Sequence, residues 1–335
     1  MEKRDVVVVG GGLAGLTTAK FLAEHGIDVL LLEEDDEFFR KPCGEGILPI
    51  SNENLFFELY DSKAGIEGGI EEVVMFVGKD RISLPVTFLM IDKKTVEKEL
   101  GRQVERFGGE IWMGEKVKRI EEGIVLPQNI RAKVVVGADG ARSVVRESAG
   151  ISSPKIGIGV EGKMNDMEEL EKEKAYVWFG RNFIPGGYAW AFPKAKYWNV
   201  GIGSCNIKSL KIYLQRFKAR FKEIKELRGA GIPFSLPTKS YGKDFILVGD
   251  SASQIMTAVG AGNLPSMICG YEGARAIISH LEKGTDLKDY EKRWRRELGL
   301  IFYESFMLCK MGQILSRVDT DISRPMIRLL KKIFA

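Results

Sequence analysis

The feature that most constrains the fold is a glycine pattern near the N-terminus. Gly10, Gly12 and Gly15 follow an apolar run at residues 6–9 and precede a helical pattern, after which a second apolar run occupies residues 29–32. Four-residue apolar runs bounded in this way are typical of parallel strands buried on both faces. The chain is therefore expected to begin as an α/β structure with a parallel sheet.

The same pattern predicts a dinucleotide site. Glycines let the backbone approach a pyrophosphate at the positive end of the helix. Glu33 stands 18 residues after Gly15, at the end of the second strand, where an acid accepts a hydrogen bond from a ribose hydroxyl. An acid rather than an arginine there favours FAD or NAD over NADP. The alternative is a glycine-rich turn followed by a surface glutamate.

Two further strand ends favour FAD over NAD. One apolar run ends at Asp139, and another ends at Asp250 and continues through Gly262 into a helical pattern. Asp250 is suited to bind a ribityl hydroxyl, and the amides of Gly262 and Asn263 are suited to face the flavin ring. Either turn alone is more simply an ordinary aspartate at a strand end. The three elements in this order favour FAD, because an NAD dehydrogenase does not need the third.

An alternating aromatic segment predicts the substrate side of the protein. Residues 155–204 have the pattern of an antiparallel sheet, and Tyr188, Trp190 and Phe192 fall on one face of a regular strand. Such a face can form the wall of an apolar pocket for a chain-like ligand. The alternative is an ordinary sheet core without a ligand.

Length and composition fit a two-domain enzyme. A chain of 335 residues with 44% hydrophobic and 29% charged residues is long enough to enclose a site. No repeat or low-complexity linker separates the halves, so the domains are expected to be interleaved. We expect an FAD-binding domain from residues 1–45, 90–150 and 240–285, a substrate domain from 46–89 and 151–239, and a helical region at 286–335.

Charge and cysteine usage narrow the partners. Residues 282–335 hold 12 basic and 8 acidic residues, which accounts for the whole net charge of +4. Residues 322–335 form a basic and apolar helical pattern that suits either an anionic membrane surface or packing on the protein. The four cysteines have no zinc-site spacing, so we expect no metal and a reducing, cytoplasmic location, with peripheral membrane contact left open. No nucleic-acid partner is expected.

Four motifs together carry a family resemblance. After the glycine turn, residues 41–47 read Lys-Pro-Cys-Gly-Glu-Gly-Ile, and residues 137–143 read Gly-Ala-Asp-Gly-Ala-Arg-Ser. Residues 185–193 read Pro-Gly-Gly-Tyr-Ala-Trp-Ala-Phe-Pro, and residues 247–252 read Leu-Val-Gly-Asp-Ser-Ala. Over about residues 1–280 the chain resembles the geranylgeranyl reductase family of FAD proteins. Archaeal members especially saturate the isoprenoid chains of membrane lipid precursors, and plant and bacterial relatives act on the geranylgeranyl chain of chlorophylls.

The resemblance implies a fold and a set of site residues. It implies an α/β fold with an FAD-binding Rossmann-like domain of the glutathione reductase/p-hydroxybenzoate hydroxylase type, an inserted antiparallel β-sheet substrate domain and C-terminal helices. Lys93 and Asn263 depart from the residues usual at those positions, which leaves the exact substrate open. With the motifs above, the expected cofactor-binding residues are Gly10, Gly12, Ala14, Gly15, Glu33, Cys43, Gly44, Gly46, Lys93, Val117, Asp139, Asp250, Gly262 and Asn263. The expected substrate residues are Tyr188, Trp190 and Phe192.

The implied function is FAD-dependent reduction of isolated carbon–carbon double bonds in a prenyl lipid. Cys43 is the candidate catalytic thiol, with simple packing against the flavin as the alternative. The electron donor is not identified by the sequence, and ferredoxin, a deazaflavin and NAD(P)H are the candidates. Two alternatives stay open here: a flavin-dependent monooxygenase or halogenase, and a flavoprotein that carries electrons to a quinone or prenyl lipid.

Overall fold

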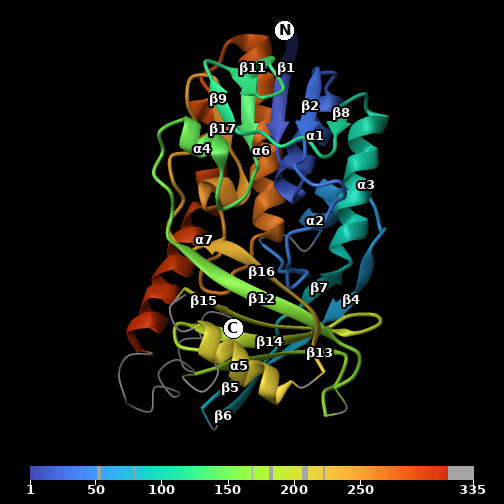
Figure 1. The fold of residues 1–335 in the computed structure, drawn as a ribbon, viewed down its shortest axis with the longest axis vertical. Coiled ribbons are helices and arrows are strands. Elements are labelled where there is room, and N and C mark those ends of the chain that lie inside the picture. Colours follow the sequence, from blue (N-terminus) through green and yellow to red (C-terminus); the bar gives the residue numbers. More distant parts are fainter. Residues whose placement is uncertain are drawn as a thin grey trace.

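The N-terminal apolar runs form the centre of a mostly parallel sheet (Figure 1). The computed structural model describes residues 1–50, 54–78, 80–167, 169–180, 184–205, 210–221 and 223–315. The strand order of this sheet is β8-β2-β1-β11-β10-β9, with β17 paired to β11. The strands are β1 (Glu2–Val9), β2 (Val29–Leu32), β8 (Glu110–Trp112), β9 (Arg119–Glu121), β10 (Ile124–Leu126), β11 (Ile130–Gly137) and β17 (Phe245–Leu247).

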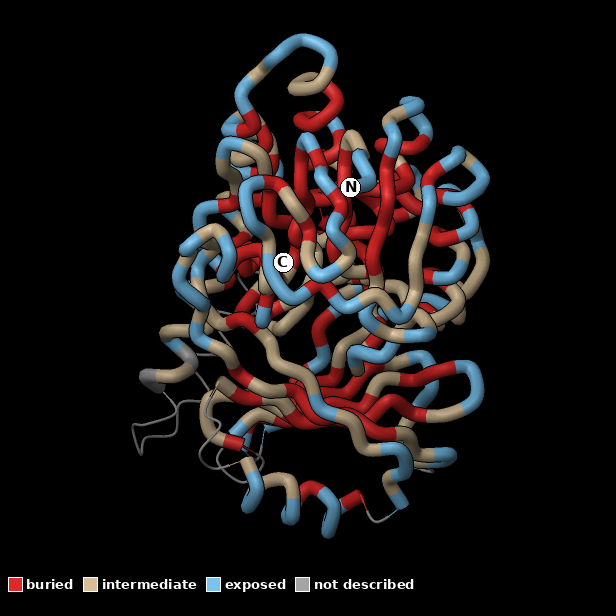
Figure 2. The backbone as a smooth tube through the Cα atoms, turned by 45° about the horizontal axis from the view of Figure 1, so that its top comes forward, coloured by how far each residue is buried: buried red, intermediate tan, exposed pale blue. Residues whose placement is uncertain are grey.

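Both faces of this sheet are buried. Val6 and Val8 of β1 belong to a core on the helical side, while Val7 and Val9 pack on the other side with Val125. This division explains why the strand is apolar throughout rather than alternating. Figure 2 shows the strands buried along their middle. The helices of this half are α1 (Leu13–Glu24), α2 (Leu55–Tyr60), α3 (Lys93–Arg106), α4 (Val144–Ser148), α6 (Asn263–Lys283) and α7 (Lys288–Leu315), with a 3₁₀ turn η2 (Gly249–Ala252).

A second sheet lies at the other end of the molecule (Figure 1). Its strand order is β16-β12-β15-β14-β13-β5-β6. The strands are β5 (Glu72–Val77), β6 (Asp80–Leu84), β12 (Ile156–Met164), β13 (Lys174–Phe179), β14 (Gly187–Pro193), β15 (Trp198–Ser204) and β16 (Lys225–Pro233). The expected antiparallel pattern holds for five neighbouring pairs, but β5 and β13 run parallel. β5 comes from a separate, earlier segment, so no hairpin fixes its direction.

The two faces of β14 have different neighbours. Ala189 and Ala191 point into a core with Phe217 of α5 (Leu210–Arg220), which covers that face. Tyr188, Trp190 and Phe192 lie on the opposite face, as the alternation predicts. That opposite face is turned toward the parallel sheet and its helices, since residues of both parts of the molecule line one cavity there.

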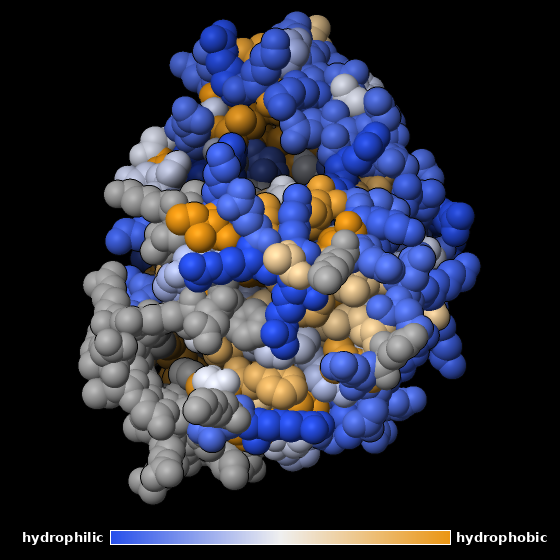
Figure 3. All heavy atoms as spheres, turned by 60° about the horizontal axis from the view of Figure 1, so that its bottom comes forward, coloured by the Kyte–Doolittle hydropathy of each residue, from blue (hydrophilic) through white to orange (hydrophobic). Residues whose placement is uncertain are grey.

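A third, small sheet joins the segment before α3. β3 (Gly46–Ile47) and β4 (Ile66–Ile70) both pair with β7 (Phe88–Ile91). Among the described residues, no helix has the length and apolar character needed to cross a bilayer. The basic segment at residues 322–335 lies outside the described residues. Figure 3, with the lower end of the molecule forward, shows a mainly hydrophilic surface with hydrophobic side chains near the middle of the face.

Candidate functional site

The three glycines of the N-terminal turn have three different structural roles. Gly10 has a φ of +105°, and a Cβ there would lie 2.5 Å from the carbonyl oxygen of Ala138. A Cβ on Gly15 would lie 2.0 Å from the carbonyl oxygen of Gly10, so this residue lets α1 pack against the turn. A Cβ on Gly12 would meet nothing within 4 Å, because that position faces open space. Gly12 is therefore where a ligand can approach the backbone.

Two helix N-termini, those of α1 and α6, line one cavity. α1 begins after Gly12 and α6 begins after Gly262, and neither N-cap has a side-chain hydrogen bond. Neither first turn contains an acidic residue. Uncapped amides and the positive ends of two helix dipoles suit an anionic ligand. Glu33 stands beside α1, where its carboxylate accepts hydrogen bonds from the amides of Gly11 (2.5 Å) and Asp35 (3.0 Å).

One cavity of about 1470 Å³ connects these helix ends to the second sheet. Pockets that bind one drug-sized ligand usually have volumes of about 300–1,000 Å³. This larger cavity therefore has room for a dinucleotide and a second ligand together. Sixteen of the seventeen residues expected to bind cofactor or substrate line it. The exception is Gly15, which is withdrawn from the wall because it packs against Gly10. The residues at the cavity wall are Gly10, Gly12, Ala14, Glu33, Cys43, Gly44, Gly46, Lys93, Val117, Asp139, Tyr188, Trp190, Phe192, Asp250, Gly262 and Asn263.

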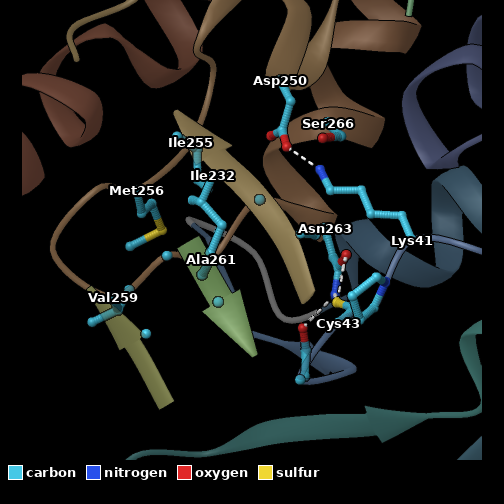
Figure 4. Close-up of a pocket in the computed structure, with 18 of the residues that line it drawn as sticks. Lys41, Cys43, Ile232, Asp250, Ile255, Met256, Val259, Ala261, Asn263 and Ser266 are labelled. Atoms are coloured by element: carbon cyan, nitrogen blue, oxygen red, sulfur yellow. Dashed lines mark hydrogen bonds and ion pairs between the residues drawn. The ribbon is translucent and has the colours of Figure 1, made fainter. Parts of the chain in front are cut away.

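The two strand-end aspartates differ in their local bonds. Asp139 uses one carboxylate oxygen to accept from the amides of Val144 (2.6 Å) and Val145 (3.3 Å), so it also caps α4. Asp250 forms an ion pair with Lys41, which points toward it across the cavity in Figure 4. The motif containing Lys41 is visible in the sequence, but only the tertiary structure pairs the two side chains.

The Cys-Gly-Glu-Gly turn sits between the two ends of the cavity. The Cys43 sulfur lies 3.4 Å from Nδ2 of Asn263 at the start of α6 (Figure 4). The same Nδ2 donates to the carbonyl oxygen of Gly46 at 3.0 Å. A Cβ on Gly44 would lie 3.2 Å from the Phe192 ring, so glycine allows the turn to rest on the aromatic strand. Asn263 therefore fixes this turn against α6.

Glu45 of that turn belongs to a buried ion cluster. Its Oε2 lies 3.1 Å from Nζ of Lys194, which is also 2.8 Å from Oε2 of Glu67. The Lys194 side chain is 0% exposed, and its Nζ also donates to the carbonyl oxygen of Ile91. Glu45 Oε1 accepts from the amide of Lys93 at the first turn of α3. Removing one partner from such a cluster leaves an uncompensated buried charge, which is strongly destabilising.

Lys93 and Glu97 form a second buried pair, one helical turn apart on α3. Their Nζ and Oε1 atoms are 3.5 Å apart, and both residues line the cavity. Burial raises the pKa of Glu97 to about 7, against the attraction of Lys93. For Lys93, burial acts to lower the pKa, but the ionisable groups around it, Cys43 and Glu97 foremost, raise it above its ordinary value. This shift favours the charged form of Lys93 in the cavity wall.

The aromatic strand is both wall and packing element. Trp190 is 7% exposed, and its Nε1 donates to Oδ1 of Asn199 at 2.9 Å. A Cβ on Gly201 would lie 2.0 Å from the indole, so the ring lies across that glycine. The hydroxyl of Tyr188 donates to the carbonyl oxygen of Val259 at 2.5 Å, and burial raises the pKa of this phenol. Tyr188 thus stays a donor and joins β14 to the segment before α6.

Sequence reasoning missed several residues of the site. Glu161 and Asn199 lie in the second sheet beside Trp190, and Ile301, Ser305 and Leu308 of α7 complete the cavity wall. A signal for Glu161 exists in the sequence, because it is the acid within the otherwise apolar and glycine-rich residues 156–162. The α7 residues carry no comparable signal, since their pattern is that of an ordinary amphipathic helix.

The donor set at the upper end of the cavity fits FAD. An open glycine at a helix N-terminus, an acid at the end of β2 and a second uncapped helix lie along one cavity wall. Residues 3–57 match the model of an FAD binding domain. The crystal structure of a p-nitrophenol 4-monooxygenase from Pseudomonas putida has this fold, with a TM-score of 0.75, 19% identity, and 97% of this chain and 92% of that chain covered. The protein is therefore an FAD-binding protein by fold and site.

The particular family follows from the remaining comparisons. Residues 155–230 match the model of the geranylgeranyl reductase catalytic domain. A digeranylgeranylglycerophospholipid reductase from Methanocaldococcus jannaschii is 30% identical, over 95% of this chain and 88% of that protein. A geranylgeranyl bacteriochlorophyll reductase-like structure from Thermoplasma acidophilum has a TM-score of 0.81 and 24% identity, over 95% of this chain and 91% of that one. The chain belongs to the geranylgeranyl reductase family.

Proposed function

We propose that this protein uses FAD to reduce isolated carbon–carbon double bonds in the geranylgeranyl chains of membrane lipid precursors. The observation that carries this proposal is the shared cavity. Its upper end is built from helix N-termini and Glu33, and its lower end is built from the aromatic face of β14 and apolar residues of β5. A nucleotide cofactor and an apolar chain can therefore occupy one continuous cavity, which the reaction needs.

The substrate dictates what the residues have to do. An isolated alkene has no carbonyl group to polarise it, so one carbon must receive a hydride while the other receives a proton. FAD, when bound and reduced, supplies the hydride. The protein binds and aligns the chain, excludes water and provides the proton. Positive charge that develops on the more substituted carbon is stabilised by the ring faces of Tyr188 or Trp190, an effect of about 2 kcal/mol when desolvated.

The cofactor contacts are assigned from the cavity wall. Glu33 would hold the ribose, the amides at the start of α1 would hold the pyrophosphate, and Asp250 with the start of α6 would hold the flavin part. Val117, Asp139 and Lys93 line the same cavity. Cys43 lies at the junction between the cofactor end and the aromatic strand, so its thiol belongs near the reacting atoms.

The electron donor belongs to a separate protein or small molecule. Gly157, Gly159 and Gly162 repeat the spacing of the dinucleotide fingerprint, but they lie within β12 rather than at a turn between a strand and a helix. They are therefore not a nicotinamide site. The candidate donors are ferredoxin, a deazaflavin and NAD(P)H, and this glycine pattern gives no support for NAD(P)H. Contact with the membrane surface through residues 322–335 is part of the same proposal, because the substrate is a lipid.

One experiment tests the reaction class. The protein is reduced with dithionite without oxygen, mixed with a geranylgeranyl lipid and a saturated control lipid, and the lipids are analysed by mass spectrometry. We expect a gain of two hydrogens for each bond reduced, in the unsaturated lipid only. Products that form only with oxygen would indicate a monooxygenase. Reduced flavin that no prenyl lipid reoxidises would indicate an electron carrier.

A further inference from the structure

Four residues at directly paired positions form a row across the second sheet, and the row begins in the aromatic strand β14. Trp190 of β14 pairs with Gly201 of β15, Gly201 pairs with Glu161 of β12, and Glu161 pairs with Arg228 of β16. Side chains at directly paired positions point to the same face of a sheet. Because Gly201 has no side chain, the indole lies across it toward Glu161, and both Trp190 and Glu161 line the cavity.

Glu161 is held in place on both carboxylate oxygens. Its Oε2 accepts from Nδ2 of Asn199 at 2.9 Å, and its Oε1 accepts from a guanidinium nitrogen of Arg228 at 3.1 Å. The same Nδ2 of Asn199 donates to the carbonyl oxygen of Cys43 at 2.9 Å, while Oδ1 of Asn199 accepts from Trp190. One amide therefore fixes Glu161, the indole and the Cys43 turn relative to one another.

The surroundings of Glu161 raise its pKa above the ordinary value of a glutamate. The residue is 5% exposed, and burial foremost raises its pKa, with the negative charge of Glu45 acting in the same direction. The hydrogen bond from Asn199 and the charge of Arg228 oppose this shift. Tyr197 is the other titratable group that interacts with Glu161, and Glu45 is itself paired with Lys194.

Glu161 is better suited to give up a proton than the nearby Glu45. Glu45 is paired with a fully buried lysine and accepts from the Lys93 amide, so its carboxylate belongs to the ion cluster that holds the Cys43 turn. The only cation paired with Glu161 in the described structure is Arg228, whose side chain is 37% exposed. Glu161 therefore lies between the apolar cavity and a side chain that reaches solvent.

We propose that Glu161 donates the proton that completes reduction of the double bond. This inference rests on the proposed function. FAD, when bound and reduced, would supply the hydride and its two electrons to one alkene carbon and would be oxidised. The O–H bond of Glu161 breaks as a C–H bond forms at the other carbon. Glu161 is left as a carboxylate beside Arg228 and recovers its proton from water.

Four proteins test this assignment: wild type, Glu161→Gln, Glu161→Asp and the control Glu226→Gln. Glutamine keeps the shape and the Arg228 and Asn199 neighbours but has no acidic proton. Glu226 is an exposed carboxylate on β16 that pairs with Lys163. FAD content, melting temperature and the rate at which a geranylgeranyl lipid reoxidises the photoreduced protein are measured on each sample without oxygen.

We expect Glu161→Gln to slow lipid-dependent reoxidation at least about 100-fold, as loss of a general acid does, with FAD content unchanged. Glu161→Asp should keep part of the rate, and Glu226→Gln should match wild type. The wild-type rate should fall as pH rises through the pKa of Glu161, because only the protonated acid can donate, and this dependence should be absent in Glu161→Gln. An equal rate and an unchanged pH profile in Glu161→Gln would overturn the assignment.

A spectroscopic measurement keeps the inference testable without turnover. An infrared difference spectrum of wild type minus Glu161→Gln should show a protonated carboxyl signal that disappears as pH rises. If Glu161→Gln does not fold, the spectrum of wild type minus Glu161→Asp should show a glutamic acid band together with an aspartic acid band of opposite sign. Absence of the protonated carboxyl band, together with a flat wild-type pH profile, overturns the assignment. Loss of the pH dependence in Cys43→Ser instead would transfer the role to the thiol. Wild type that reduces no prenyl lipid at all would contradict the proposed function rather than Glu161.

Discussion

At the scale of single residues, the cofactor end of the cavity depends on positions without a side chain as much as on the side chains that line it. Gly12 leaves the start of α1 open, whereas Gly10 and Gly15 are required by the backbone around them. A substitution at Gly12 therefore acts on ligand binding, while substitutions at the other two act on folding. The common motif conceals this difference, because all three glycines look alike in the sequence.

The carboxylate of Glu33 is expected to contribute a charge-assisted hydrogen bond to FAD. Glu33→Ala should weaken FAD binding by about 1.5–3 kcal/mol, the range for hydrogen bonds to charged groups. Glu24→Ala, an exposed acid at the end of α1, is the matched control. The dissociation constant is measured by titrating apoprotein with FAD and following flavin fluorescence. Equal affinity in both variants would remove Glu33 from the cofactor site.

At the scale of elements, the geometry of β14 depends on glycines in the neighbouring strand. The indole of Trp190 reaches Asn199 only because Gly201 of β15 leaves room for it. Gly203 lies under the same ring at a less crowded distance, since a Cβ there would be 3.5 Å from the indole. The aromatic wall is thus a property of two strands in a fixed register and not of β14 alone.

This dependence predicts the effect of one added methyl group. Gly201→Ala should displace the indole, with a loss of about 1–3 kcal/mol in the free energy of unfolding, the usual range for overpacking. Reduction of a geranylgeranyl lipid should fall as well, because Trp190 would lose its bond to Asn199. Gly229→Ala on β16 is the control, since its Cβ would lie 3.5 Å from Val160, an ordinary contact. Denaturant unfolding and lipid reduction are measured on both variants, and identical behaviour would contradict this packing.

At the scale of the whole molecule, the cavity lies between two sheets that the chain visits repeatedly. The first 47 residues contain the glycine turn and the first strands of the parallel sheet. Residues 72–84 form strands of the second sheet, and the chain later returns to the first sheet at β11 and β17. α7 then contributes Ile301, Ser305 and Leu308 to the cavity wall. Helix α7 is therefore part of the site.

The basic segment after α7 is expected to bring this cavity to its lipid substrate. Replacing Arg324, Arg328, Lys331 and Lys332 by glutamine should reduce binding to anionic vesicles, since each basic residue near such a surface contributes about 1 kcal/mol. Co-sedimentation with vesicles at low and moderate salt measures the effect, and neutral vesicles are the control. Unchanged binding to anionic vesicles would indicate that the segment packs on the protein instead.

The sequence by itself determined those features that depend on neighbours along the chain. The apolar run of β1, the glycine turn, the acid at Glu33 and the alternating face of β14 are local patterns, and each corresponds to an element of the structure. The sequence could also predict FAD as the cofactor and the family, because the motifs that carry them are short and contiguous. The comparisons support both predictions.

Only the tertiary structure decided which distant side chains meet. Lys41 pairs with Asp250, Lys194 neutralises Glu45, and Asn199 connects Glu161 to the Cys43 turn, over separations that no local pattern encodes. The parallel pairing of β5 with β13 has the same origin, since a strand that arrives from a remote segment can pair in either direction. Periodicity fixes which face of a strand is buried, whereas the register and neighbours of that strand are set by packing of the whole chain.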